Sequence, residues 1–390
     1  MERMKKFLAE REKTRTLRFL APLTRLGRGW VKPLDSDQRL LDFSSNDYLA
    51  LSEHPEVISA SRKYLEMFGA GAGAARLMSG DLEINHLLEQ EIAQLKSTEA
   101  ALTFGSGYLA NTGIISALAG RCDLIITDRL SHASIYDGCL LSGARTIRFR
   151  HNDLMHLKQI LQEKRSQFNS CLVIVESIYS MDGDRCPLAE LVKLKKDHDF
   201  LLMVDEAHAT GLYGENGAGV IEEDKVSSAV DIAMGTFGKA LGSYGAYAAG
   251  SRELIKFLVN TARSFIYSTA LPPAVIGATL ASLYLVKTEP QLRLDLHEKV
   301  AYFKKQLRKN GFRDDPGTTQ IIPVMVGDSA KALAIAEELR QKHVYVKAVR
   351  PPTVPDGTAR LRFSITRYQQ QKDLKECART LVSALRKIST

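Results

Sequence analysis

The sequence predicts an α/β protein in which helices flank a mostly parallel sheet and a smaller α+β domain follows. Its 390 residues are enough for two domains that share a site. Short, strongly apolar runs alternate with helical stretches, and from about Lys287 long charged helices and alternating strands replace them. We expect an N-terminal segment at residues 1–45, a large domain at 46–287 and a small domain at 288–390 that packs with the N-terminal segment.

The apolar runs are the expected strands of the large domain. Each run is brief and is followed by polar residues or glycine, which is typical of buried parallel strands joined by crossover helices. The runs are residues 100–104, 124–127, 171–175, 201–204 and 232–234. A helix is expected at residues 55–68, and apolar residues at helical spacing predict another at 84–95.

The last hundred residues predict the smaller α+β domain. Charged, helix-like sequence covers residues 291–310, and a second helix is expected at 330–342. Strands are expected at residues 321–326, 344–349 and 359–366, before a final helix.

Composition and charge exclude several classes of protein. Hydrophobic residues make up 45% and charged residues 25% of the chain, which is ordinary for a globular protein and argues against disorder. The net charge is +8, but lysine and arginine are spread along the chain, which favours anionic small substrates over nucleic acid. Residues 1–18 lack the apolar core of a signal peptide, and the five cysteines show no CxxC spacing. We therefore expect a cytoplasmic protein with reduced thiols.

An uncharged stretch at residues 264–286 is long enough to cross a bilayer. Pro272 and Pro273 interrupt it, and several serines and threonines dilute it. Because membrane insertion favours continuous apolar sequence, this pattern predicts a buried loop followed by a packed helix, and no membrane association.

Polar residues follow the expected strands, and ligands bind beyond the carboxyl ends of parallel strands. Asp205 and His208 follow one strand, Lys239 follows the next, and His132 follows another. The turn Gly105-Ser106-Gly107-Tyr108 follows the strand at 100–104. Pyridoxal phosphate requires these residue types: an amine for its aldehyde, a carboxylate for its pyridine nitrogen and a glycine-rich helix start for its phosphate. We expect no metal site.

Other classes share parts of this pattern. Residues 204–208 match the acidic box of a helicase, but the P-loop is absent, since Gly238-Lys239 is followed by alanine. Residues 105–110 fit the pattern GxGxx[GA], so a dinucleotide-binding oxidoreductase is an alternative that leaves Asp205, His208 and Lys239 without roles. A basic scaffold that binds acyl carriers is the non-enzyme alternative. Considered alone, Asp205 could be a helix cap and His132 could be a structural histidine. Because both are expected at the same end of the sheet, a ligand-binding site is favoured.

Motifs along nearly the whole chain resemble those of the α-oxoamine synthases, a family of fold-type I pyridoxal-phosphate enzymes. Two of them carry the expected cofactor residues, Asp205-Glu206-Ala207-His208 and Thr236-Phe237-Gly238-Lys239. The others are Ser45-Asn46-Asp47-Tyr48-Leu49, Asp128-Arg129-Leu130-Ser131-His132-Ala133-Ser134, Ser180-Met181-Asp182-Gly183-Asp184, Ile266-Tyr267-Ser268-Thr269 and Arg350-Pro351-Pro352-Thr353-Val354-Pro355. The resemblance implies a large pyridoxal-phosphate-binding domain and a smaller C-terminal domain.

The resemblance implies a cofactor role for each matching residue. Lys239 would bind the cofactor covalently, Asp205 would pair with its pyridine nitrogen, and His208 would hydrogen-bond its phenolic oxygen. His132 would stack on the face of the ring and help to place the acyl group. The residues expected to hold the cofactor, largely at its phosphate, are Gly107, Tyr108, Ser180 and Thr236.

The resemblance also implies substrate residues and a homodimer. Asn46 and Arg362 would receive the amino-acid carboxylate. Thr353 would contact substrate, and Arg18 would approach the acyl substrate. Alternation places Arg360 on the same strand face as Arg362, and Arg15 competes with Arg18, so the residue pattern leaves both choices open. In the dimeric family the sites are composite, and Ser268 and Thr269 would reach the phosphate of the neighbouring subunit.

The implied activity is the decarboxylative condensation of an amino acid with an acyl thioester. The sequence at residues 350–362 most resembles the members that use L-alanine and a pimeloyl thioester carried by coenzyme A or an acyl carrier protein. The members that condense glycine with acetyl-coenzyme A are the alternative within the family.

Overall fold

The computed structural model describes residues 1–14 and 16–389. The chain separates into two compact units. One comprises Met1–Ala50, Met181–Gly183 and Leu294–Thr390, and the other comprises Leu51–Ser180 and Asp184–Arg293. We call them the small and the large unit.

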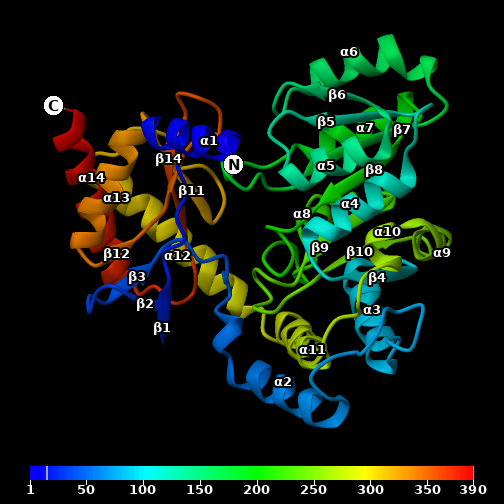
Figure 1. Cartoon of the computed structure of the whole chain (residues 1–390), viewed down its shortest axis with the longest axis horizontal. Helices are drawn as coiled ribbons and strands as arrows, with labels where there is room; N and C mark the ends of the chain where they lie inside the picture. Colours follow the sequence, from blue (N-terminus) through cyan, green and yellow to red (C-terminus); the bar gives the residue numbers. More distant parts are fainter. Residues whose placement is uncertain (15, 390) are drawn as a thin grey trace. The chain divides into compact units, whose positions relative to one another are not determined.

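A seven-stranded sheet forms the centre of the large unit, with the strand order β4-β10-β9-β8-β7-β5-β6 (Figure 1). All neighbours are parallel except at β10, which is antiparallel to both β4 and β9. The strands are β4 (Ala100–Phe104), β5 (Leu124–Asp128), β6 (Arg145–Phe149), β7 (Cys171–Glu176), β8 (Leu201–Asp205), β9 (Ile232–Thr236) and β10 (Ala246–Gly250). The five expected strands are all present, and the predicted mostly parallel sheet is confirmed.

Helices connect and cover these strands. They are α2 (Pro55–Phe68), α3 (Glu83–Lys96), α4 (Gly107–Leu118), α5 (Ala133–Ser142), α6 (Leu154–Lys164), α7 (Leu188–Asp197), α8 (Val220–Glu223), α9 (Arg252–Thr261), α10 (Arg263–Ile266) and α11 (Pro273–Thr288). Helix α11 packs on α2, where a side chain at Gly277 would meet the Ala60 carbonyl oxygen at 2.8 Å. Among the helices of the described residues, none has the length and apolar character that a membrane crossing requires.

One face of the sheet carries the hydrophobic core against α4, α5, α9 and α10. Ile174, Met203 and Met234 from three neighbouring strands belong to this core. Because side chains alternate between the two faces of a strand, the residues two positions further on each strand point to the same side. Those residues are Glu176, Asp205 and Thr236. The end of the sheet thus carries a row of polar groups on the face that α4 and α5 cover.

The small unit contains two sheets. The first has the order β1-β2-β3-β12 and the second the order β11-β14-β13. Their strands are β1 (Leu23–Gly27), β2 (Trp30–Pro33), β3 (Leu40–Asp42), β11 (Ile321–Gly327), β12 (Val344–Tyr345), β13 (Ala348–Val349) and β14 (Ala359–Ser364). Its helices are α1 (Glu2–Lys13), α12 (Gln291–Lys309, in this unit from Leu294), α13 (Ser329–Gln341) and α14 (Gln371–Ser389).

Residues 344–349 correct the prediction of one continuous strand. Val344 and Tyr345 pair in parallel with Leu41 and Asp42, whereas Ala348 and Val349 pair with β14 in the other sheet. The chain changes sheets between these pairs, so the apolar run contributes to two short strands.

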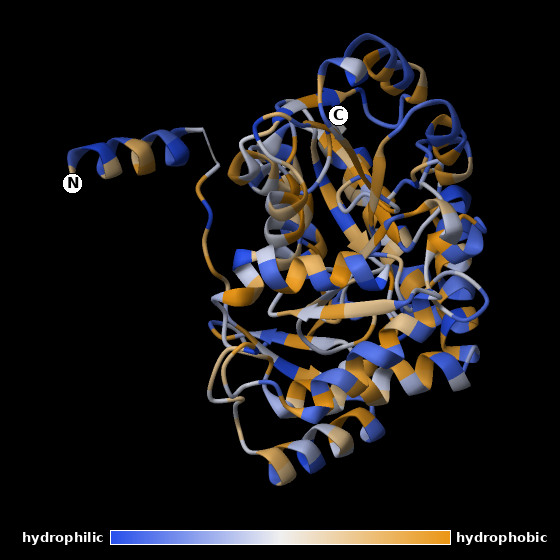
Figure 2. Ribbon diagram, turned by 90° about the vertical axis from the view of Figure 1, so that its right-hand side faces the viewer, coloured by the Kyte–Doolittle hydropathy of each residue, from blue (hydrophilic) through white to orange (hydrophobic). Residues whose placement is uncertain are grey.

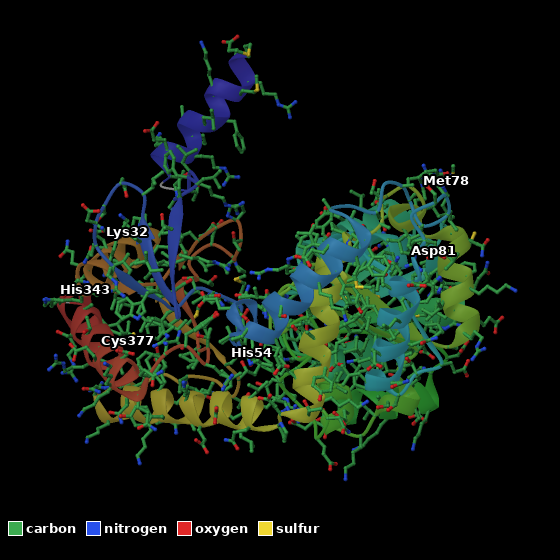
Figure 3. All side chains as sticks on the ribbon, turned by 90° about the horizontal axis from the view of Figure 1, so that it is seen from below. Lys32, His54, Met78, Asp81, His343 and Cys377 are labelled. Atoms are coloured by element: carbon green, nitrogen blue, oxygen red, sulfur yellow. The ribbon has the colours of Figure 1, made fainter. Side chains whose placement is uncertain are left out.

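The small unit has its own aromatic core. The ring of Phe43 lies 5.7 Å from that of Phe363 and 6.0 Å from that of Phe303. Cys377 on α14 is buried in this unit (Figure 3), and all five cysteines of the chain are free thiols. Helix α1 has no buried residue and stands clear of the rest of its unit (Figure 2).

Candidate active site

Lys239 lies in a turn that follows β9, next to a histidine that follows β8. Its Nζ is 3.0 Å from Nε2 of His208. The turn closes through a hydrogen bond from the Gly242 N–H to the Lys239 carbonyl, and Gly242 has a φ of +59°. A side chain at Gly242 would meet the Ser52 backbone nitrogen at 2.3 Å, so only glycine fits. The sheet edge therefore brings the predicted lysine and histidine together.

Asp205, which belongs to the row of polar groups at the end of the sheet, accepts two hydrogen bonds. It is 5% exposed. Its Oδ2 accepts a hydrogen bond from Asn111 Nδ2 at 2.9 Å, and its Oδ1 accepts one from the Ala207 N–H at 2.9 Å. Two donors stabilise the ionised form of a carboxyl group. Asn111 was not predicted from the sequence, and its signal is the one amide side chain of helix α4.

His132 caps the start of α5 and is linked to Asp205 by a chain of side chains. Its Nδ1 lies 2.7 Å from Ser134 Oγ, which accepts a hydrogen bond from Asn111 Nδ2 at 3.0 Å. The backbone N–H of His132 donates to Oε1 of Glu176 at 2.5 Å. Glu176 is a second site residue that the sequence analysis did not assign, although it follows an expected strand.

The geometry around Thr236 and Gly107 fits an anionic group such as a phosphate. Among the residues that the structure describes, no group hydrogen-bonds to the buried Thr236 Oγ1. A side chain at Gly107 would meet Thr236 Cγ2 at 2.7 Å, so a glycine there keeps the space open. Gly107 is the first residue of the twelve-residue helix α4, where backbone N–H groups attract anions. With the nearby amine and carboxylate, this donor set matches pyridoxal phosphate.

Two further predicted cofactor residues lie on the loops around this edge. Tyr108, in the first turn of α4, is about half exposed, and its hydroxyl hydrogen-bonds to Asp137. Ser180 follows β7 on a loop that the bridge between Ile178 and Arg185 closes.

Ser268 and Thr269 lie at the end of α10, and their backbone contacts join neighbouring segments. The Ser268 N–H donates to the Phe265 carbonyl, and Thr269 forms a bridge with Ala75. Ala75 belongs to the loop that carries Met78 and Asp81 (Figure 3). Large apolar side chains nearby, Leu77, Met78 and Tyr267, are exposed.

The small unit brings the predicted carboxylate-binding residues together. Arg362 is 8% exposed, and its Nη1 donates to Asn46 Oδ1 at 3.1 Å and to Ser364 Oγ at 2.8 Å. Arg360 instead forms a salt bridge of 2.6 Å with Asp182. Because a carboxylate already occupies Arg360, the structure favours Arg362 for a substrate carboxylate.

Two other predicted substrate residues, Arg18 and Thr353, also meet within the small unit. Arg18 Nη2 donates to Thr353 Oγ1 at 2.7 Å, and the adjacent Leu17 carbonyl accepts from Arg350 at 3.3 Å. The competing residue Arg15 lies outside the described residues.

His151 joins two loops at the sheet edge. Its Nδ1 is 2.9 Å from Oδ1 of the fully buried Asp128, and its Nε2 is 2.8 Å from Oδ2 of Asp184. Asp128 precedes the His132 loop, and Asp184 follows the Ser180 loop. Burial opposes the charge on this imidazole, but the hydrogen bonds to both carboxylates raise the pKa of His151 to about 10. The sequence analysis missed this residue because its partners lie 23 and 33 positions away.

We expect His151→Gln to destabilise the protein in a pH-dependent way. The folded-state pKa lies above the ordinary value of 6.5, so the stabilisation is complete below about pH 6.5 and is lost as the pH rises through about 10. Loss of charged hydrogen bonds predicts a decrease of about 2 kcal/mol in the free energy of unfolding near pH 6. Urea unfolding of both proteins near pH 6 and pH 10 measures this; an equal difference at both pH values would contradict it.

Comparisons with known proteins place the chain in a family. It matches the model of class I and II aminotransferases over residues 38–381. An 8-amino-7-oxononanoate synthase of Geotalea daltonii is 48% identical over 357 residues, which cover 91% of each chain. Serine palmitoyltransferase from S. paucimobilis with a bound PLP–myriocin aldimine has a TM-score of 0.94 at 30% identity, covering 100% of this chain and 98% of that one.

A second solved structure has the same name as the first relative. The 8-amino-7-oxononanoate synthase from Francisella tularensis has a TM-score of 0.78 at 26% identity, covering 90% of this chain and 99% of that one. These likenesses confirm the predicted fold-type I architecture. The chain belongs to the class I and II aminotransferase family and, within it, to the family of the 8-amino-7-oxononanoate synthases.

Proposed function

We propose that this chain condenses L-alanine with a pimeloyl thioester to give 8-amino-7-oxononanoate, carbon dioxide and the free thiol carrier, a step of biotin biosynthesis. It acts as an acyltransferase that depends on pyridoxal phosphate. The observation that carries this proposal is the pair formed by the Lys239 amine and His208 Nε2, at 3.0 Å, beside the buried carboxylate of Asp205. The relatives with this name support the choice of substrates.

The large unit supplies the residues that hold the cofactor. Pyridoxal phosphate, when bound, withdraws electrons from the α-carbon of the amino acid. The Lys239 amine would bind the cofactor aldehyde, and the negative charge of Asp205 would keep a proton on the pyridine nitrogen. His208 would hydrogen-bond the phenolic oxygen. The phosphate is held by Thr236 Oγ1 and by residues at the start of α4 and on the neighbouring loop, namely Gly107, Tyr108 and Ser180.

The proton transfers and substrate contacts use the remaining residues. The Lys239 amine would act as the base that takes the α-proton of the amino acid and as the acid that returns a proton to the product. The forked guanidinium of Arg362 and the amide of Asn46 bind the carboxylate of L-alanine. His132 would lie over the cofactor ring and orient the acyl group. Arg18 and Thr353, which hydrogen-bond to each other, contact the acyl substrate.

We also propose a homodimer with composite active sites. The exposed apolar side chains Leu77, Met78 and Tyr267 lie beside Ser268 and Thr269, and a partner subunit would cover them. In that assembly Ser268 and Thr269 hydrogen-bond the cofactor phosphate of the neighbouring subunit.

Product analysis tests the proposed reaction. The holoenzyme is incubated with L-alanine and pimeloyl-coenzyme A, and separately with glycine and acetyl-coenzyme A, and the products are identified by mass spectrometry. We expect 8-amino-7-oxononanoate and carbon dioxide from the first mixture. Turnover of the second mixture alone would identify a glycine C-acetyltransferase, and absence of product from both would overturn the proposal.

A further inference from the structure

Glu176 is a buried carboxyl group beside Asp205 that the reaction described above does not use. Strands β7 and β8 are parallel, and Glu176 is the register partner of Asp205. Adjacent strands lie about 4.8 Å apart, and residues in register point to the same face. The two residues are only 3% and 5% exposed. Two carboxylates this close and this buried strongly disfavour simultaneous ionisation, so one of them holds a proton.

The hydrogen bonds determine which carboxyl group is ionised. Asp205 accepts from the Asn111 amide and the Ala207 N–H, and both donors favour its negative charge. Glu176 Oε1 accepts the backbone N–H of His132, a weaker support for negative charge than the two donors on Asp205, and the carbonyl oxygen of a neutral acid can also accept it. The proton therefore belongs on Glu176.

The surrounding charges agree with this assignment. Burial raises the pKa of Glu176 well above its ordinary value, and the neighbouring charge of Asp205 raises it further. The His132 N–H and Lys239 act in the opposite direction, and the charge of Asp128 adds to the increase. The groups that favour the neutral acid outweigh those that favour the carboxylate.

We propose that Glu176 is a neutral positioning residue that anchors the His132 backbone while the negative charge of the row stays on Asp205. The roles of His132 and Asp205 rest on the function proposed above. Through its Oε1, Glu176 fixes the backbone of His132, which caps α5, and hence the position of the His132 side chain that would lie over the cofactor ring. Because it carries no charge, it does not compete with Asp205 for the proton of the pyridine nitrogen.

A leucine and a glutamine replacement separate the two parts of this proposal. Glu176→Leu removes the acceptor and leaves the His132 N–H unpaired, so we expect kcat to fall about ten- to a hundredfold in the holoenzyme. Glu176→Gln restores a neutral acceptor of the same shape, so we expect it to recover most of the lost kcat. Failure of the glutamine variant to recover kcat, or to fold, would overturn the proposal, because a neutral isostere replaces a neutral acid without penalty.

Infrared spectroscopy provides a test that does not depend on turnover. The holoenzyme labelled with carbon-13 at its glutamate carboxyl groups should show the carbonyl band of a protonated acid at neutral pH, and Glu176→Gln should lack it. If Glu176 were ionised, the wild type and the variant would have the same absorbance in this band, and that result would contradict the proposal. If the protein turned over neither substrate pair but showed the band, the proposed reaction would fail while the protonation of Glu176 would stand.

Discussion

Lys239→Ala is expected to abolish condensation, with a fall in turnover of at least about a thousandfold. The replacement removes the amine that we propose binds the cofactor aldehyde. It also removes the proposed base for the α-proton, a contribution typically worth a hundred- to ten-thousandfold by itself. The methyl group of alanine reaches neither the cofactor nor His208, whose Nε2 is 3.0 Å from the lysine amine in the wild type. Steady-state release of the free thiol from pimeloyl-coenzyme A measures the effect.

Lys256→Ala is the matched control for this experiment. Lys256 is an exposed lysine on α9 in the same unit, so its loss removes one positive charge without touching the site. We expect wild-type turnover from it. Turnover by Lys239→Ala at the rate of this control would refute the role of Lys239.

Asp205→Asn should produce the second largest loss, at least about a hundredfold in kcat. The asparagine keeps the size of the side chain and can accept the hydrogen bond from Asn111. It removes the negative charge that, in the proposed function, keeps the pyridine nitrogen protonated. The cofactor remains covalently bound through Lys239, so its visible absorbance should persist while turnover is lost.

The opposite end of the same strand provides the control for this change. Asp199 precedes β8, is largely exposed and pairs with Arg165. Asp199→Asn also removes one carboxylate, and its turnover should equal that of the wild type. Equal activities of the two asparagine variants would show that the charge at position 205 is not required.

The sequence predicted the parallel strands because they are buried on both faces and therefore read as continuous apolar runs. In the seven-stranded sheet of the large unit, it missed two strands for different reasons. β10, Ala246–Gly250, is mostly alanine and glycine, which carry little strand preference, and β6, Arg145–Phe149, is an edge strand interrupted by charges. The domain limits expected near residues 45 and 287 stay a prediction.

The sequence predicted those site residues that have reactive or charged side chains and come directly after an expected strand. Lys239, His208 and Asp205 were assigned in this way, and the structure places them at one sheet edge. Asn111, His151 and Glu176 were not assigned. Their interaction partners lie on neighbouring strands or on loops that are distant in the sequence. The choice between Arg360 and Arg362 similarly required the salt bridge of Arg360 with Asp182, which alternation along the strand cannot reveal.

Reductive trapping tests the central claim most directly. The holoenzyme is treated with borohydride, which fixes the link between an amine and the cofactor aldehyde, and the labelled peptide is sequenced by mass spectrometry. The account predicts loss of the yellow absorbance and a single pyridoxyl group on Lys239. A label on another lysine, or no label at all, would contradict it.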